Sequence, residues 1–362
     1  MEEVRVSLAR SGFGEKEREA VAAGGLTASL FRYDTGVEAI RLSNSRGNVV
    51  ILPYMGQMVW SATFDGVEIA MQSMFAAPRP AKTIVETYGC LAYHCGILRS
   101  GVPGPGDNHA LHGEAPCAEM DAAGVAVGED ASGPWMAATG VREYAMGFGA
   151  HYLATPRVVL RPAEAACDIV MEVENLSATP MDLMYMCHAN FAFAEGGRIV
   201  QPVPFTPEFV VARTAIPGHI TATPEYEARI KGYAAHPERM EALKEPDRYD
   251  PEQVFYIKGL KRGADGLVHF MLMRREGDAF TVAYDPESMP HTIRWVLVNG
   301  DQKVAAFAMP ATCEPEGYTA EKRKGNVRSL ASRAKARFTT RVGYVEAVRA
   351  ASEARTIEGE NR

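Results

Sequence analysis

Short runs of alternating apolar and polar residues, separated by turn-forming residues, constrain the fold of this chain more than any other feature. The runs begin at residue 26 and include LTASLFR, EAIRLSN, VVILPY, MVWSATF, HYLATPRVVL, ACDIVMEVEN, AFTVAYDP and TIRWVLVNG. A period of two residues is typical of strands with one buried face, and Asp65-Gly66 is typical of a two-residue hairpin turn. We therefore expect an all-β chain, a large antiparallel β-sandwich with few short helices.

One longer helix is expected as an excursion from the sheets, over Thr223–Lys244. Thr223 is a residue type that caps helices, and Pro224 suits the first helical position. One face of this helix would carry Tyr226, Ile230, Tyr233, Met240 and Leu243. The strand pattern continues on both sides of it, and no stretch has the composition of a linker. We expect one domain at residues 26–348, an N-terminal extension at 1–25 and a charged C-terminal tail at 349–362.

Net charge and cysteine content limit which partners and which cellular compartment we expect for this protein. The net charge of −7 is the wrong sign for a protein that binds nucleic acid. No run of about 18 apolar residues predicts a membrane span, and the charged N-terminus lacks the apolar core of a signal peptide. The six cysteines form no CxxC pair, so we expect reduced thiols and a cytoplasmic protein. Whether the chain is a monomer or a homodimer stays open.

Three histidines, His94, His109 and His112, fall within nineteen residues around the loop GVPGPGDN. Together with Arg99 and Asn108 they suit hydrogen bonds to a polyhydroxylated ligand, because imidazole both donates and accepts. The alternative is a metal site that also uses Glu114. A third interpretation is that they are loop histidines without a role.

Two further candidates lie on predicted strands. His188 sits in the apolar run MDLMYMCHANFAF, where strand alternation places it on one face with Asn190. It is either a core histidine with a hydrogen-bond partner or a general acid or ligand-binding group. Glu314 ends an apolar strand and precedes Pro315. It is either an ordinary turn residue or a partly desolvated carboxylate that acts as a base.

The order of these motifs resembles the aldose 1-epimerase (galactose mutarotase) superfamily, and more narrowly its bacterial branch of the DUF4432 type. Asn108-His109-Ala110-Leu111-His112-Gly113 matches the family's N-x-x-L-H-G-G motif, except that Glu114 replaces the second glycine. The later matches are Cys187-His188-Ala189-Asn190-Phe191 and Glu314-Pro315. The resemblance spans roughly residues 25 to 348 and implies the galactose mutarotase-like sandwich.

The resemblance also implies an activity, the interconversion of the anomers of an aldose. Glu314 would be the general base and His188 the general acid, with His112 as the third catalytic residue. The resemblance implies Arg99 and Glu252 as substrate-binding residues, and the loop and strand arguments above add His94, Asn108 and Asn190. No metal or nucleotide cofactor is implied.

Two rival functions remain on the sequence alone. One is a metal-dependent isomerase, epimerase or lyase acting on a sugar or sugar acid, and the other is a carbohydrate-binding protein without catalysis. Residues 100–141 contain no Lys or Arg and six acidic residues, which favours a neutral sugar over a phosphorylated one and leaves Arg99 as the cation nearest in sequence.

Overall fold

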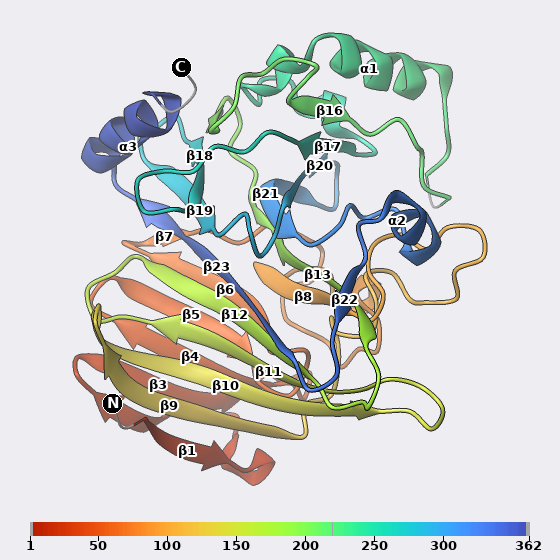
Figure 1. Cartoon of the computed structure of the whole chain (residues 1–362). Coiled ribbons are helices and arrows are strands. Elements are labelled where there is room, and N and C mark those ends of the chain that lie inside the picture. The colour runs from red at the N-terminus through yellow and green to blue at the C-terminus, as the bar shows by residue number, and fades with distance from the viewer. Residues whose placement is uncertain (1–2, 219, 360–362) are drawn as a thin grey trace.

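Two antiparallel sheets make up most of the molecule (Figure 1). The computed structural model describes residues 3–218 and 220–359. The nine-stranded sheet runs, in spatial order, β1 (Val4–Leu8), β9 (Ala122–Asp130), β10 (Gly133–Ala145), β11 (His151–Leu160), β12 (Ala166–Asn175), β23 (Lys335–Val345), β19 (Ala279–Tyr284), β18 (Val268–Met273) and β15 (Arg198–Val200).

The second sheet has fourteen strands. Its main path runs β16 (Val210–Ala212), β17 (Gln253–Ile257), β20 (His291–Val298), β21 (Lys303–Ala311), β13 (Met181–Ala189), β8 (Ala92–Ile97), β6 (Met58–Phe64), β5 (Gly47–Leu52), β4 (Glu38–Asn44), β3 (Leu26–Arg32) and β2 (Arg18–Ala23). Three short strands branch from it: β14 (Phe191–Ala192), β22 (Arg328–Leu330) and β7 (Val67–Glu68). The predicted all-β sandwich is confirmed.

The helices are short and lie outside the two sheets (Figure 1). They are η1 (Arg10–Gly12), η2 (Ile84–Glu86), α1 (Pro224–Ala235), η3 (Pro237–Met240), η4 (Pro246–Tyr249), α2 (Tyr318–Lys324) and α3 (Ala347–Gly359). None of the helices in the described residues is long and apolar enough to cross a bilayer.

Helix α1 begins where the sequence predicts and ends early. The Thr223 hydroxyl accepts a hydrogen bond from the Tyr226 amide at 3.2 Å, and Pro224 occupies the first turn. The helix stops at Ala235, nine residues short of the predicted end at Lys244. His236 precedes Pro237, and the proline ring disfavours helical backbone in the residue before it. Met240 and Leu243 are buried all the same, from η3 and the turn after it.

Both ends of the described chain contact the two sheets: β1 and β2 fall within residues 1–25, and most of α3 falls within residues 349–359. Strand β1 pairs with β9, and β2 pairs with β3. At the other end, Ala350, Ala354 and Ile357 of α3 pack on Val200 and Met271 of the nine-stranded sheet. The two terminal segments have many polar and charged residues because β1 and β2 are edge strands and because α3 buries only a narrow stripe of its surface.

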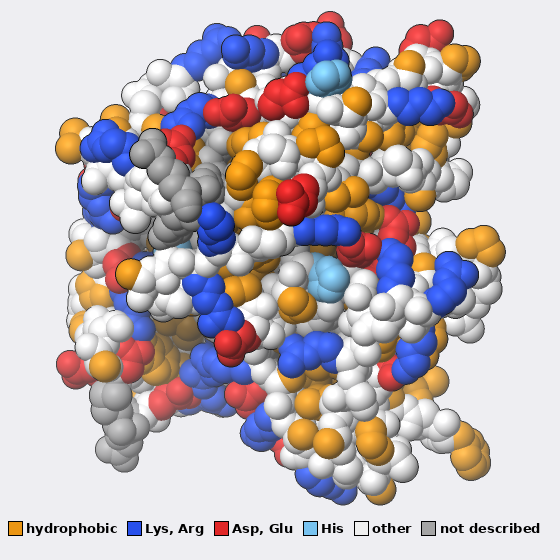
Figure 2. Space-filling view, turned by 45° about the horizontal axis from the view of Figure 1, so that its top comes forward, with side chains coloured by type: hydrophobic (Ala, Val, Ile, Leu, Met, Phe, Trp, Pro, Cys, Tyr) orange, Lys and Arg blue, Asp and Glu red, His pale blue; other side chains and the backbone are white. Residues whose placement is uncertain are grey.

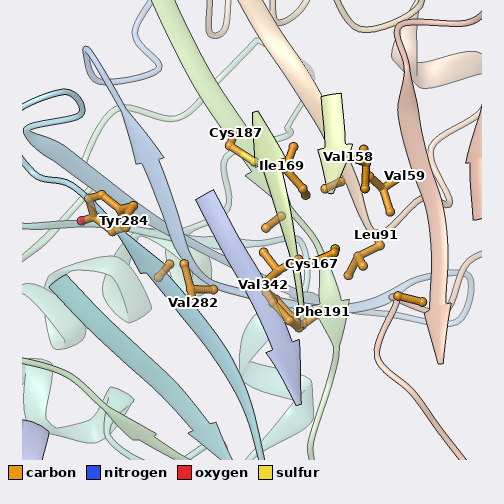
Figure 3. Packing of buried hydrophobic residues seen from close by; sticks show 14 of the residues in the cluster. Val59, Leu91, Val158, Cys167, Ile169, Cys187, Phe191, Val282, Tyr284 and Val342 are labelled. Carbon is orange, nitrogen blue, oxygen red and sulfur yellow. The ribbon is translucent and has the colours of Figure 1, made fainter. Parts of the chain in front are cut away.

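The main core fills the space between the two sheets (Figure 3). Phe191, Val282 and Cys167 are among its fully buried members, and each large apolar side chain buried in this way contributes about 1.5–3 kcal/mol. All six cysteines are free thiols, as predicted. The Asp65-Gly66 turn is also confirmed, since both residues have positive φ between β6 and β7. Figure 2 shows Lys and Arg side chains interspersed with Asp and Glu over one face.

Candidate functional site

A cavity of about 810 Å³ opens on the face of the fourteen-stranded sheet that points away from the core. Alternation along β13 explains its position: Cys187 and Ala189 enter the core between the sheets, whereas Met186 and His188 face the cavity. We call it the His188 cavity. Its lining comprises Met74, Phe75, Val85, Tyr88, Val102, Pro103, Leu111, His112, Met186, His188, Arg213, Gly218, Ile220, Asp250, Pro251, Glu252, Val254, Ile293, Trp295, Leu297, Asn299, Gln302, Met309 and Pro315.

His188 is held in one orientation by hydrogen bonds at both ring nitrogens. Asn190 Nδ2 donates to the Cys90 carbonyl at 3.1 Å, which turns Asn190 Oδ1 toward His188 Nδ1 at 2.7 Å. Nδ1 therefore carries the hydrogen, and Nε2 accepts one from the Tyr88 hydroxyl at 3.2 Å. The Tyr93 hydroxyl donates to Tyr88 at 3.0 Å, and the Tyr93 ring stacks on His188 at 4.6 Å between centroids.

Burial sets the protonation states of this group. Desolvation lowers the pKa of His188 to about 3, so the imidazole is neutral at physiological pH. Desolvation also raises the pKa of the Tyr88 hydroxyl well above its usual value, so Tyr88 stays a phenol. The resting pair is thus a neutral acceptor and a neutral donor.

The Asn190 contact predicts the tautomer of His188. In ¹⁵N NMR of histidine-labelled protein, we expect a protonated Nδ1 and an unprotonated Nε2. Asn190→Leu should remove this preference and lower the free energy of unfolding by about 1–3 kcal/mol, because it leaves His188 Nδ1 and the Cys90 carbonyl unpaired. A protonated Nε2 in the unmodified protein would contradict the assignment. Asn190 is fully buried and does not line the cavity, so its position suits a support for His188 rather than the predicted ligand contact.

His112 reaches the same cavity from the loop that follows β8. Its ring lies 5.0 Å from that of His188, measured between centroids, in an edge-to-face arrangement. The loop is shaped by positive φ at His112 and Gly113. A Cβ at Gly113 would lie 1.9 Å from the Arg99 carbonyl oxygen, so only glycine fits there. The sequence pattern Leu-His-Gly therefore encodes the presentation of His112.

Glu114, which replaces a glycine of the family motif, has a structural contact. Its Oε1 accepts hydrogen bonds from the Ile97 and Leu98 amides at 2.9 and 2.7 Å, and from the Tyr152 hydroxyl at 3.1 Å. The carboxylate thereby joins the His112 loop to the end of β8. It does not line the cavity.

Charged groups gather on the cavity wall formed by β16 and β17. The Arg213 Nη2 donates to Glu316 Oε2 at 3.0 Å, and its Nη1 lies 3.9 Å from Glu252 Oε1. Burial opposes the charge of Arg213, but its hydrogen bond to Glu316 and the nearby negative charges of Glu316 and Glu252 together outweigh burial, so the pKa of Arg213 is raised. Glu252 Oε2 accepts from Trp295 Nε1 at 2.8 Å. The predicted Glu252 thus does line the cavity.

Glu314 and Arg99 are placed elsewhere. Glu314 follows the end of β21, and its carboxylate accepts from Lys324 Nζ at 2.7 Å. Arg99 lies over the Tyr318 ring, 3.6 Å from its centroid, and donates to the Leu98 carbonyl. Neither side chain is in the cavity lining. Met186 pairs with Ala311, so the antiparallel register sets Met309, rather than a carboxylate, across from His188.

The three clustered histidines separate in space. His94 points into the core, where its Nδ1 contacts the Tyr185 hydroxyl at 2.9 Å and desolvation lowers its pKa to about 4. His109 Nδ1 contacts the Ala110 carbonyl, and the neighbouring Asn108 is exposed. Of the three, only His112 reaches the cavity. Over residues 3–218 and 220–359, no group of three His, Cys, Asp or Glu side chains is arranged to hold a metal ion.

Sequence reasoning missed Tyr88, Trp295 and Arg213. Trp295 had a usable signal, because Ile293, Trp295 and Leu297 alternate along β20 and all line the cavity. Tyr88 precedes the Gly89-Cys90 pair at the end of a long loop, and nothing local marks it. Arg213 is brought to the site by the pairing of β16 with β17.

Comparisons with known proteins agree on the fold. A protein named "putative aldose 1-epimerase" from Klebsiella pneumoniae superposes with a TM-score of 0.82 at 16% identity, covering 100% of this chain and 96% of that one. A galactose 1-epimerase from Lactobacillus acidophilus gives 0.56 at 13%, covering 91% and 98%. A galactose mutarotase-like protein from Clostridium acetobutylicum gives 0.56 at 11%, covering 91% and 98%. No curated protein sequence matches this chain.

The large antiparallel sandwich is therefore that of galactose mutarotase-like proteins, as the sequence motifs predict. The family model for the domain of unknown function DUF4432 matches residues 34–343, which is most of the chain. The chain belongs to the DUF4432 family.

Proposed function

We propose that this protein interconverts the anomers of a reducing sugar in the His188 cavity, by acid–base opening and reclosure of the hemiacetal ring. The observation that carries the proposal is the pair of Tyr88 and His188 on the cavity wall. Tyr88 Oη, a donor, and His188 Nε2, an acceptor, lie 3.2 Å apart. The two oxygens of a hemiacetal are bonded to one carbon, so a donor and an acceptor at this separation match them.

The proposed step leaves both groups unchanged after each ring opening. His188 Nε2 takes the proton of the anomeric hydroxyl, and Tyr88 gives its proton to the ring oxygen as the bond from that oxygen to the anomeric carbon breaks. The imidazolium then returns its proton to the Tyr88 oxygen across their hydrogen bond. Rotation about the bond between the first two carbons and reversal of the transfers give the other anomer. Such acid–base assistance accounts for about 10²–10⁴ in rate.

This assignment differs from the roles implied by the family resemblance. Burial keeps the His188 imidazole neutral, and the Asn190 contact leaves Nε2 without a hydrogen, so His188 is in the protonation state of a proton acceptor and not of the expected general acid. The ion pair with Lys324 and its absence from the cavity lining weigh against Glu314 as the base. His112, Glu252 and Arg213 are proposed to bind sugar hydroxyls, and Trp295 offers a ring face for the sugar to stack on.

Saturation-transfer NMR on a panel of aldoses tests the proposal. We expect purified protein to accelerate exchange between the two anomeric proton signals of at least one sugar, well above the rate in buffer. Absence of acceleration for every aldose of the panel, at protein concentrations where sugar binding is detected, would rule the activity out.

A second candidate is a carbohydrate-binding protein without catalysis. One observation favours it: the residue across from His188 is Met309, whose side chain cannot act as a base, so the cavity has no carboxylate at that position. The two candidates separate cleanly, because the second predicts saturable sugar binding in titration calorimetry with anomer exchange at the buffer rate.

A further inference from the structure

The His188 cavity is larger and more apolar than an unsubstituted sugar needs. Its volume of about 810 Å³ is near the upper end for small-molecule sites. Most of its lining residues are apolar, and the polar ones are His112, His188, Arg213, Asp250, Glu252, Asn299 and Gln302. A sugar hydroxyl placed against the apolar wall would lose its hydrogen bonds to water without replacement, which weakens binding.

The apolar wall continues to the mouth of the cavity. Met74 and Val85 both line the cavity, yet 54% and 57% of their surfaces are exposed. Both belong to the segment between β7 and β8 that also carries Phe75 and Tyr88. Val85 is three residues before Tyr88, so the apolar mouth adjoins the proposed reacting pair along the chain.

The charges in the lining disfavour an anionic substituent. Among the described lining residues, Arg213 is the one Lys or Arg, and it is paired with Glu316. Asp250 and Glu252 add two carboxylates to the same wall. A phosphate or carboxylate on the ligand would meet more negative than positive charge there.

We propose that the ligand of this cavity is a reducing sugar that carries an uncharged apolar substituent, such as an acyl group, away from its anomeric carbon. The substituent lies between Met74, Phe75 and Val85, and the sugar ring lies beside His188 and Tyr88. This inference rests on the proposed function for the position of the ring.

Titration calorimetry with the whole 362-residue chain tests this ligand class. The probes are D-glucose, 6-O-hexanoyl-D-glucose, D-glucose 6-phosphate, maltose and glycerol monohexanoate. D-galactose and 6-O-hexanoyl-D-galactose are measured in parallel. Each methylene buried against the mouth strengthens binding about fourfold, so we expect the hexanoyl sugar to bind at least about tenfold more tightly than the parent sugar. Glucose 6-phosphate should bind no better than glucose.

Two variants locate the substituent. Met74→Gln combined with Val85→Thr should remove most of the hexanoyl advantage and leave the affinity for glucose unchanged. Val348→Thr is the matched control, because Val348 is an exposed valine in α3 outside the cavity lining. It should change neither affinity.

The outcomes separate this inference from the activity. Equal affinities for glucose and its ester, tighter binding of maltose or the phosphate, or equally tight binding of glycerol monohexanoate would each overturn the ligand class. Anomer exchange is measured on the same sugars. Acceleration without ester preference would refute only the ligand class, whereas ester preference without acceleration would refute only the activity.

Discussion

Tyr88→Phe is expected to slow anomer exchange by about 10²–10⁴-fold, with a much smaller change in sugar affinity. The substitution keeps the ring that packs edge-to-face on Trp295 and His188, and removes only the hydroxyl that donates to His188 Nε2. Saturation-transfer NMR gives the rate and calorimetry gives the affinity. A rate within about threefold of the unmodified protein would contradict the paired mechanism.

Four companion variants make the result specific. Tyr93→Phe removes the hydroxyl that donates to Tyr88 but lies outside the cavity lining, so its effect should stay within about tenfold, the weight of one neutral hydrogen bond. His188→Asn should be as slow as Tyr88→Phe, and the double variant should be no slower than either, because the two act as a unit. Glu314→Gln should change the rate little. A large loss there would return the role of base to Glu314.

Stability should fall steeply on mild acidification. His188 and His94 have native pKa values lowered to about 3 and about 4 by desolvation, whereas an unfolded histidine titrates near 6.5. Between pH 7.5 and pH 5 only the unfolded state takes up these protons. The free energy of unfolding should therefore drop by about 4 kcal/mol, about 2 kcal/mol from each histidine. Burial also lowers the pKa of His291, which acts in the same direction.

Urea unfolding at a series of pH values measures this dependence. The stability contributed by the neutral histidines is fully present above pH 7 and is lost as the pH falls through 6.5. His94→Gln should reduce the drop by about half, because one of the two buried imidazoles is removed. A free energy of unfolding that stays constant from pH 7.5 to pH 5 would show that neither imidazole is kept neutral by burial.

The local pattern of the chain was sufficient for the fold class and for part of the site. Period-two alternation predicts the strands, because a side chain every second residue must enter a core between two sheets. The same alternation explains why His188 departs from its apolar run: it is on the face of β13 that lines the cavity. Leu111-His112-Gly113 encodes a loop through the conformational freedom of glycine, and the structure brings His112 beside His188.

Other site assignments depended on contacts that no local pattern contains. His94 and His188 both lie on buried strands, and their roles diverge because one points between the sheets and the other away from them. A one-residue difference in register decides that direction. Arg99 is near the motif in sequence but lies over Tyr318, whereas Arg213 arrives through strand pairing.

The sequence by itself therefore determined an antiparallel β-sandwich of the galactose mutarotase type and free thiols, and it predicted His112, His188 and Glu252, which line one cavity. The tertiary structure alone decided which groups face one cavity. Tyr88 and Trp295 line it, whereas Glu314 forms an ion pair with Lys324 outside the lining. The physical reason is the separation in sequence over which each kind of interaction acts. Alternation and turn chemistry act over a few residues, whereas hydrogen bonds and ion pairs at the site join residues that are far apart in the chain.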